Sequence, residues 1–219
     1  MSSALPILHV YEHCPFCVKA RMIFGLHALP FEKRIFLHDD TTGPTEMVGR
    51  KVVPILEENG TFMPESLDII AHIEKSAPTP LLTGPLNDAI TQWLSSIAAP
   101  AYKLLIPRVA SAPFPEFSTT SARANFIRRK ERAEHPFGII LDNSTDDIQH
   151  INQKLLELAP LIQSPSAVNG TLSYDDLHLF AQLRSLSLIR GIHYPVEVDA
   201  YRHTMSERAR VPLLEVFAV

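Results

Sequence analysis

The apolar positions of residues 4–76 alternate between short continuous runs and helical spacing. The run at 5–11 predicts a strand, and the segment 15–28 predicts a helix because its apolar residues recur at helical intervals. Pro30 ends this helix before a second predicted strand at 31–37. A strand, a helix and a strand in this order predict two parallel strands.

The next residues predict the rest of a small α/β domain. A short helix at 41–47 ends at Gly49, strands at 52–56 and 61–63 form a hairpin, and a helix at 66–75 stops before Pro78. The resulting order, strand-helix-strand-helix-strand-strand-helix, is that of a thioredoxin fold. We therefore expect a thioredoxin-like α/β domain over residues 1–76.

The sequence pattern changes after residue 76. Residues 77–86 are rich in proline and lack a periodic pattern, so we expect a linker there, followed by an all-helical domain over 87–219. The predicted helices of this domain are 87–110 (kinked at Pro100 or Pro107), 119–134, 145–158, 173–190 and 196–208.

Ser173 and Asp176 form a predicted capping box at the start of the helix 173–190. We expect this capping box to contribute to stability.

Composition and charge narrow the possible functions. The chain has 219 residues, 46% of them hydrophobic, a net charge of −4 and a pI near 6.2, so it is globular and has no basic footprint for nucleic acid. The first residues lack the features of a signal peptide, and no apolar run reaches the roughly 20 residues of a membrane span. We therefore expect a soluble cytoplasmic protein.

The two cysteines of the chain form the motif Cys14-Pro15-Phe16-Cys17, directly after the first predicted strand. A C-x-x-C pair at a strand-to-helix turn is typical of a thiol redox centre. A side chain that opens a helix lies beside unpaired N–H groups and the positive end of the dipole, and both favour a thiolate. Cys14 is therefore the predicted nucleophile. Lys19 and Arg21 add little, and Glu12 partly opposes them.

Two structural interpretations of the cysteine pair are weaker. A closed zinc site needs four ligands, and His9 and His13 are too local to complete one, so we expect no metal. A disulfide that closes so short a loop removes little entropy from the unfolded chain. In a reducing compartment, thiol exchange explains a lone pair better.

Two further motifs predict a ligand site. Val53-Pro54 opens a predicted strand, and the backbone of Val53 could pair with an extended ligand. Only about 5–6% of X–Pro bonds are cis, but the fold context favours cis here. In Pro64-Glu65-Ser66 a helix begins directly after a strand, which suits a carboxylate, while Glu65 suits an ammonium group. The γ-glutamyl end of glutathione carries both groups, although an ordinary helix start explains Glu-Ser equally well.

With these motifs, the chain resembles the glutaredoxins and, over its full length, the two-domain glutathione-transferase-like fold. The likeness is strongest to the large bacterial glutaredoxins that have a second, helical domain. The matching segments are 13–26, 47–51, 53–56, 63–66, 80–84, 116–119 and 169–170 with the Ser173 cap.

The resemblance implies roles for the motif residues. Cys14 would attack mixed disulfides, Cys17 would resolve them, Val53 would hold the backbone of the glutathione cysteine, and Glu65 with Ser66 would hold the γ-glutamyl carboxylate. Pro54 would be the cis proline, and Lys51 or Arg34 would face the glycine carboxylate.

The implied activity is glutathione-dependent thiol-disulfide exchange. Glutathione would be the reducing co-substrate, the partners would be glutathionylated or disulfide-containing proteins, and the chain would act as a monomer without membrane or nucleic acid. The main alternative is a glutathione transferase or dehydroascorbate reductase of the same fold. A third possibility is a non-enzymatic transferase-fold protein, one that binds partners or resembles the intracellular chloride channels.

Overall fold

The computed structural model describes residues 4–219, which divide into two compact units. The first unit consists of the chain up to Pro80 together with 113–129 and 209–211, and the second of 81–112, 130–208 and 212–219. The linker predicted at 77–86 contains the first of these boundaries. Residues 113–129 belong to the first unit although they lie between segments of the second, and no sequence motif predicts this.

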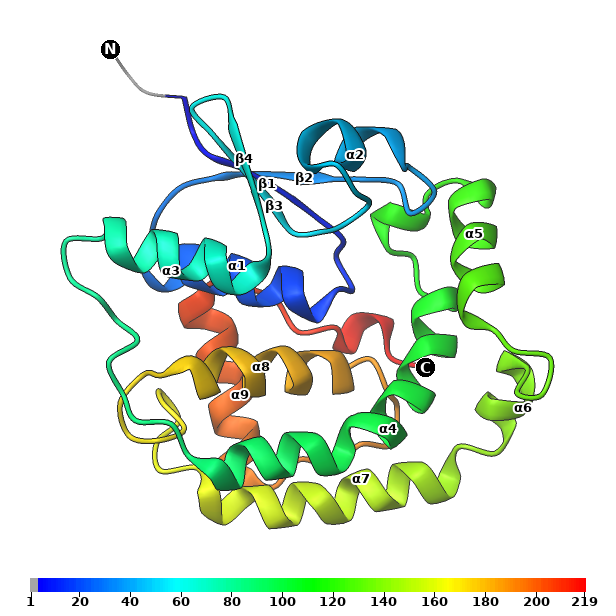
Figure 1. The fold of residues 1–219 in the computed structure, drawn as a ribbon. Coiled ribbons are helices and arrows are strands. Elements are labelled where there is room, and N and C mark those ends of the chain that lie inside the picture. Colours follow the sequence, from blue (N-terminus) through cyan, green and yellow to red (C-terminus); the bar gives the residue numbers. More distant parts are fainter. Residues whose placement is uncertain (1–3) are drawn as a thin grey trace. The chain divides into compact units, whose positions relative to one another are not determined.

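The first unit contains a mixed four-stranded sheet in the order β2-β1-β3-β4. β1 pairs parallel to β2, as predicted, and β3 pairs antiparallel to both β1 and β4. Figure 1 shows α1 and α3 on one face of the sheet and α2 on the other. The bounds are β1 Ile7–Val10, α1 Pro15–Leu26, β2 Glu32–Ile35, α2 Thr42–Val48, β3 Ile55–Glu58, β4 Thr61–Pro64 and α3 Ser66–Ser76.

The core of this unit lies between the sheet and the helices α1 and α3. Leu8 and Val10 of β1 and Ile55 of β3 are fully buried, as are Met22 of α1 and Ile69 of α3. α1 packs against both the sheet and α3, so most of its circumference is buried. Its sequence is accordingly apolar on most sides of the helix. This packing fixes the start of α1, where the cysteine pair lies.

The excursion 113–129 adds a short 3-10 helix, η1 (Pro115–Phe117), and most of α5 (Thr120–Lys130) to the first unit. The backbone N–H of His38 donates to the carbonyl of Glu116 at 2.9 Å, and the His38 ring bonds the Asn125 side chain at 3.1 Å. These bonds tie η1 and α5 to the loop after β2.

In the second unit the described residues form helices, joined by loops that contain isolated bridges, and no strand. Ser173 donates its backbone N–H to the Asp176 carboxylate at 2.8 Å, which confirms the predicted capping box. The helices are α4 Asp88–Ser111, α6 Phe137–Asp142, α7 Thr145–Leu158, η2 Ala159–Leu161, α8 Tyr174–Leu186, α9 Val196–Ala209 and η3 Glu215–Phe217.

One of the predicted helices with internal prolines is found as expected. α4 continues through Pro100 and Pro107, and Figure 1 shows its axis changing direction in its second half. Two other predicted helices differ from those observed. The predicted helix 119–134 ends at Lys130, because the chain turns at 132–135 and restarts as α6 after Pro136, a helix the pattern did not predict. The predicted helix 173–190 ends at Leu186, where the Ser187 hydroxyl bonds the Arg184 carbonyl at 2.6 Å.

Candidate active site

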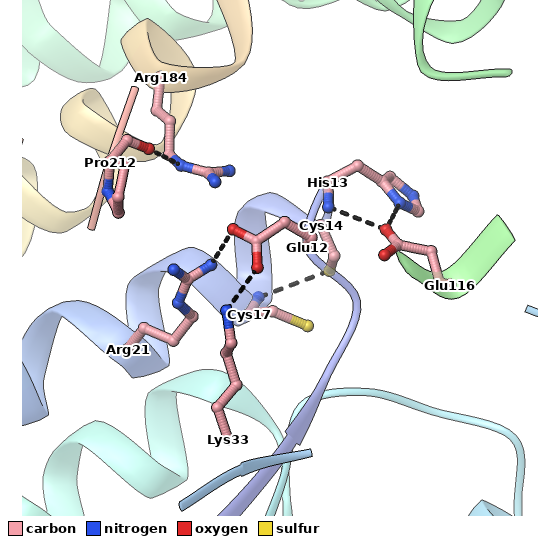
Figure 2. Close-up of polar contacts among 9 residues, drawn as sticks. All are labelled: Glu12, His13, Cys14, Cys17, Arg21, Lys33, Glu116, Arg184 and Pro212. Carbon is pink, nitrogen blue, oxygen red and sulfur yellow. Dashed lines mark hydrogen bonds and ion pairs between the residues drawn. The ribbon is translucent and has the colours of Figure 1, made fainter. Parts of the chain in front are cut away.

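Cys14 is the N-cap residue of α1, and Pro15 occupies the first helical position, as predicted. The backbone of Cys14 is extended, with φ −74° and ψ 119°, and the Cys14 Sγ accepts the backbone N–H of Cys17 at 3.5 Å. Figure 2 shows this contact at the open end of the helix. The Cys14 sulfur therefore takes the place of the side-chain oxygen that caps many helices.

The two thiols differ in exposure and in acidity. Both are free, but Cys14 is partly exposed and Cys17 is buried. A hydrogen bond from the Cys17 thiol, aided by the charge of His13 and by helix N–H groups, lowers the pKa of Cys14 to about 7 against the effect of burial. Burial raises the pKa of Cys17 well above its usual value. The Cys14 thiol is therefore the more acidic and the more accessible of the two.

We expect alkylation to report this asymmetry directly. The rate at which iodoacetamide modifies Cys14 should reach half of its plateau near pH 7, because the thiolate is the reacting form. Cys17 should stay unmodified over the same range. Mass spectrometry of the peptides would measure both rates, and a midpoint near that of a free cysteine would contradict the assignment.

The cations near the motif are engaged elsewhere. Arg21 Nη1 lies 2.6 Å from one carboxylate oxygen of Glu12, and Lys33 Nζ lies 2.8 Å from the other (Figure 2). The Lys19 ammonium lies 4.6 Å from the centroid of the Phe16 ring. The minor role predicted for Lys19 and Arg21 agrees with these contacts.

His13 and Glu116 also belong to this site, although no sequence motif connects them. The backbone N–H of His13 donates to Glu116 Oε1 at 3.0 Å, and its Nδ1 lies 2.6 Å from the same oxygen (Figure 2). The two residues are 103 positions apart. A histidine directly before a reactive cysteine is a usable sequence signal for such a role, in addition to the zinc-ligand interpretation of His13.

The peptide bond between Val53 and Pro54 is cis, which confirms the expectation for Pro54. Pro54 is buried and immediately precedes β3. Val53 is half-buried and lies before the first residue of the paired register. Its backbone groups are therefore outside the sheet ladder.

Glu65 and Ser66 form the junction of β4 and α3, as predicted. Glu65 has φ 71° and ψ 119°, in the left-handed half of backbone space that favours glycine. Its Oε1 accepts from Arg50 at 2.6 Å, and Ser66 is buried at the first turn of α3. A glutamate kept in a strained conformation at a helix start points to a functional use of its side chain.

The sheet register relates these motifs to one another. His9 of β1 is paired with Ile55 of β3, and Ile55 is paired with Pro64 of β4. The end of β1 that leads to Cys14, the start of β3 and the end of β4 therefore lie at the same end of the sheet. Lys51 donates to the His38 carbonyl, whereas Arg34 forms an exposed pair with Glu32.

Neither a metal centre nor a membrane span is found in residues 4–219. No group of three histidine, cysteine or acidic side chains there could hold a metal ion. Among the same residues, no helix is both long and apolar enough to cross a bilayer.

A thioredoxin-type sheet with a C-x-x-C pair opening its first helix, joined to a helical unit, defines a thiol oxidoreductase of glutathione-transferase-like architecture. The model of the glutathione S-transferase N-terminal domain matches residues 8–81, and that of the glutaredoxin 2 C-terminal domain matches residues 89–218. Glutaredoxin 2 of Escherichia coli K12 is 45% identical over 97% of this chain and 99% of its own. The chain belongs to the glutaredoxin 2 family.

Solved structures agree with this assignment. Glutaredoxin 2 of Salmonella typhimurium, crystallised in complex with glutathione, matches with a TM-score of 0.96 and 45% identity over the whole of both chains. A glutathione transferase of Phanerochaete chrysosporium matches 99% of this chain and 97% of its own with a TM-score of 0.66 and 15% identity, which shows a shared fold. The predicted family, fold class and enzyme class, a glutathione-dependent thiol oxidoreductase, are confirmed.

Proposed function

We propose that this chain reduces protein–glutathione mixed disulfides and protein disulfides, with Cys14 as nucleophile, Cys17 as resolving thiol and glutathione as reductant. The observation that carries the proposal is the asymmetry of the pair. Cys14 is partly exposed and caps α1 with a lowered pKa, whereas Cys17 is buried with a raised pKa. Such a pair combines an attacking thiolate with a protected second thiol.

In the monothiol route, the Cys14 thiolate attacks the glutathione sulfur of a mixed disulfide, and the protein thiolate leaves and takes up a proton. The product is a disulfide between Cys14 and glutathione. The thiolate of a second glutathione attacks the glutathione sulfur of that disulfide, so glutathione disulfide leaves and the Cys14 thiolate is restored. One glutathione thiol is consumed for each protein thiol released, and the other half of the glutathione disulfide is the glutathionyl group of the substrate.

In the dithiol route, Cys14 attacks a protein disulfide and Cys17 then displaces the protein thiol by attacking the Cys14 sulfur. The resulting bridge between Cys14 and Cys17 is reduced by two glutathione molecules. Cys17 must lose its proton for this step. Burial, a hydrogen bond with Cys14 and the Cys14 charge all raise the pKa of Cys17. A disulfide at Cys14 would remove the contribution of the Cys14 charge.

Glutathione would lie along the end of the sheet that carries Cys14. The backbone of Val53, left outside the ladder by Pro54, would pair with the glutathione cysteine. Glu65 would accept from the γ-glutamyl ammonium group, and the Ser66 hydroxyl and the first N–H groups of α3 would hold its carboxylate. The strained backbone of Glu65 supports this use.

Substitution of Glu65 separates binding from folding. Glu65→Gln should raise the KM for glutathione about 5- to 30-fold, because a charge-assisted hydrogen bond contributes about 1–2 kcal/mol. Glu65→Gly should raise KM similarly while leaving stability unchanged or higher, since glycine adopts φ 71° without strain. Initial rates at varied glutathione and urea unfolding would measure the two effects.

Glu58→Gln is the matched control for this prediction. Glu58 pairs with His72 at 2.8 Å and faces Thr61 at the opposite end of the β3–β4 hairpin. Its loss should leave the KM for glutathione unchanged. An equal KM for Glu65→Gln and the wild type would remove Glu65 from the binding site.

The test of the proposed function is turnover of a small glutathione mixed disulfide, coupled to glutathione reductase and NADPH, beside conjugation of glutathione to an aromatic halide. We expect disulfide reduction and negligible conjugation. The side chain of Tyr11 argues against a transferase, since burial raises the pKa of its hydroxyl above the usual value and it would not ionise to activate glutathione. Conjugation without disulfide reduction would overturn the proposal.

We propose that the protein acts as a monomer in the reducing cytoplasm, on glutathionylated or disulfide-containing proteins. Free cysteines at neutral pH suit a compartment whose thiols are kept reduced. Light scattering on the reduced protein would measure its mass, and a dimer would correct this statement.

A further inference from the structure

The side chain of Glu116 is fully buried in the first compact unit, within the short helix η1. Its Oε1 accepts both the backbone N–H and the ring N–H of His13, and its backbone carbonyl accepts the N–H of His38. Its Oε2 has no hydrogen-bond partner within residues 4–219. One carboxylate oxygen thus binds the residue that precedes Cys14 at two atoms.

The ring of His13 is fixed by aromatic neighbours. It stacks on Tyr11 at a centroid distance of 5.9 Å and on Phe117 at 5.5 Å, and the edge of Phe126 lies at 5.5 Å. Its side chain is 15% exposed. Few rotamers are open to a ring in these surroundings. Because Nδ1 is held against the Glu116 carboxylate, this contact also determines that Nδ1 carries a proton.

A buried carboxylate is costly unless a positive charge accompanies it. Burial alone raises the pKa of Glu116, but the hydrogen bonds and charge of His13 outweigh this effect and hold the pKa below its usual value. The carboxylate is therefore ionised, and by Coulomb attraction it stabilises positive charge on the His13 ring. That charge also favours the Cys14 thiolate.

Other titratable groups act on Cys14 and His13 or on their neighbours. Those between β1 and α1, on α1, in the loop after β2, before β3 and on α5 are Tyr11, Glu12, Cys17, Lys19, Arg21, His38, Asp40, Lys51 and Arg129. Lys51 and Arg129 act on His38, whose pKa is lowered to about 4, chiefly by burial, so His38 is neutral at the pH of the reaction. His13 is therefore the histidine of this group that contacts the Glu116 carboxylate directly.

We propose that Glu116 is a positioning residue of the active site, which holds His13 in place and stabilises its positive charge beside the Cys14 thiolate. The inference rests on the proposed role of Cys14 as nucleophile. Residues 113–129 would then be part of the active-site machinery and would not serve only as a connection between helices of the second unit.

The first test is the pH profile of Cys14 alkylation in Glu116→Gln. The amide keeps the shape and one acceptor but removes the charge, so we expect the midpoint to rise by about 0.5–1 pH unit, with alkylation at pH 6 slower by about 3- to 10-fold. Glu74→Gln is the matched control. Glu74 Oε1 lies 2.5 Å from His27 Nε2, so these residues form another part-buried His–Glu pair, which joins the end of α1 to α3. Glu74→Gln removes the charge of this pair and should leave the pH profile of Cys14 alkylation unchanged.

A double-variant cycle shows whether Glu116 acts through His13. His13→Gln should give the same upward shift, and adding Glu116→Gln to it should give no further shift. An unchanged or lowered midpoint in folded Glu116→Gln, or a full shift that persists in the His13→Gln background, would overturn the proposal. If Glu116→Gln does not fold by circular dichroism, Glu116→Asp and His13→Gln provide the same test, and an unchanged midpoint in both would overturn it.

Alkylation requires no glutathione, so this inference and the proposed function can fail separately. A wild type without glutathione-dependent turnover, but with the predicted shift in Glu116→Gln, would contradict the function and keep the positioning role. Normal glutathione-dependent turnover of the wild type, without the shift in Glu116→Gln, would support the function and contradict the positioning role.

Discussion

Cys14→Ser should abolish glutathione-dependent reduction of a small mixed disulfide, by about a thousandfold or more, because a serine hydroxyl is not ionised at neutral pH and cannot attack a disulfide. Cys17→Ser should retain turnover within about tenfold of the wild type. The monothiol route uses only Cys14.

The reason for the second expectation is compensation between acidity and reactivity. Loss of the Cys17 thiol removes the largest contribution to the lowered pKa of Cys14, so less thiolate is present near pH 7. The remaining thiolate is more basic and hence more nucleophilic, with a Brønsted coefficient of about 0.4–0.5. Reduction of a protein disulfide, which needs a resolving thiol, should fall much further in Cys17→Ser.

The measurement is the coupled assay on the wild type and the two single variants, with mass spectrometry of the enzyme at steady state. Cys17→Ser should accumulate an adduct of one glutathione on Cys14. If both variants lost turnover equally, the dithiol route would be obligatory. If Cys14→Ser remained active, Cys14 would not be the nucleophile.

Asp176→Ala should lower the free energy of unfolding by about 3–5 kcal/mol, the largest effect that we expect on stability. The carboxylate is fully buried and accepts from Val168 N–H at 2.7 Å, Ser173 N–H at 2.8 Å and Tyr201 O–H at 3.0 Å. Burial raises the pKa of Asp176 although these donors oppose it. Truncation leaves three donors without their acceptor.

Asp146→Ala is the control for this variant. Asp146 lies in the first turn of α7, as Asp176 does in α8, but its side chain is exposed. Its loss should cost about 0.5 kcal/mol or less. Urea unfolding followed by circular dichroism would measure both variants, and a loss below about 1 kcal/mol for Asp176→Ala would mean that water or rearrangement satisfies the donors.

Local patterns were sufficient for most of the first unit. The strands and helices of 5–76 were predicted within a few residues, because alternation, helical spacing and turn residues act over short distances. The same local logic placed Cys14 at the N-cap and Ser173 in a capping box. It failed where a helix end depended on distant groups, as at Ser187, whose hydroxyl also accepts the N–H of Leu214 at 2.8 Å.

The sequence by itself determined the place of the cysteine pair, the order of the elements in residues 5–76 and the start of each helix that carries a motif, since these depend on neighbouring residues. Only the tertiary structure decided that Cys17 is buried, that residues 113–129 pack in the first unit and that Glu116 meets His13 across 103 positions. A buried ion pair between distant residues leaves no periodic trace, because its energy depends on desolvation and geometry that exist only after folding.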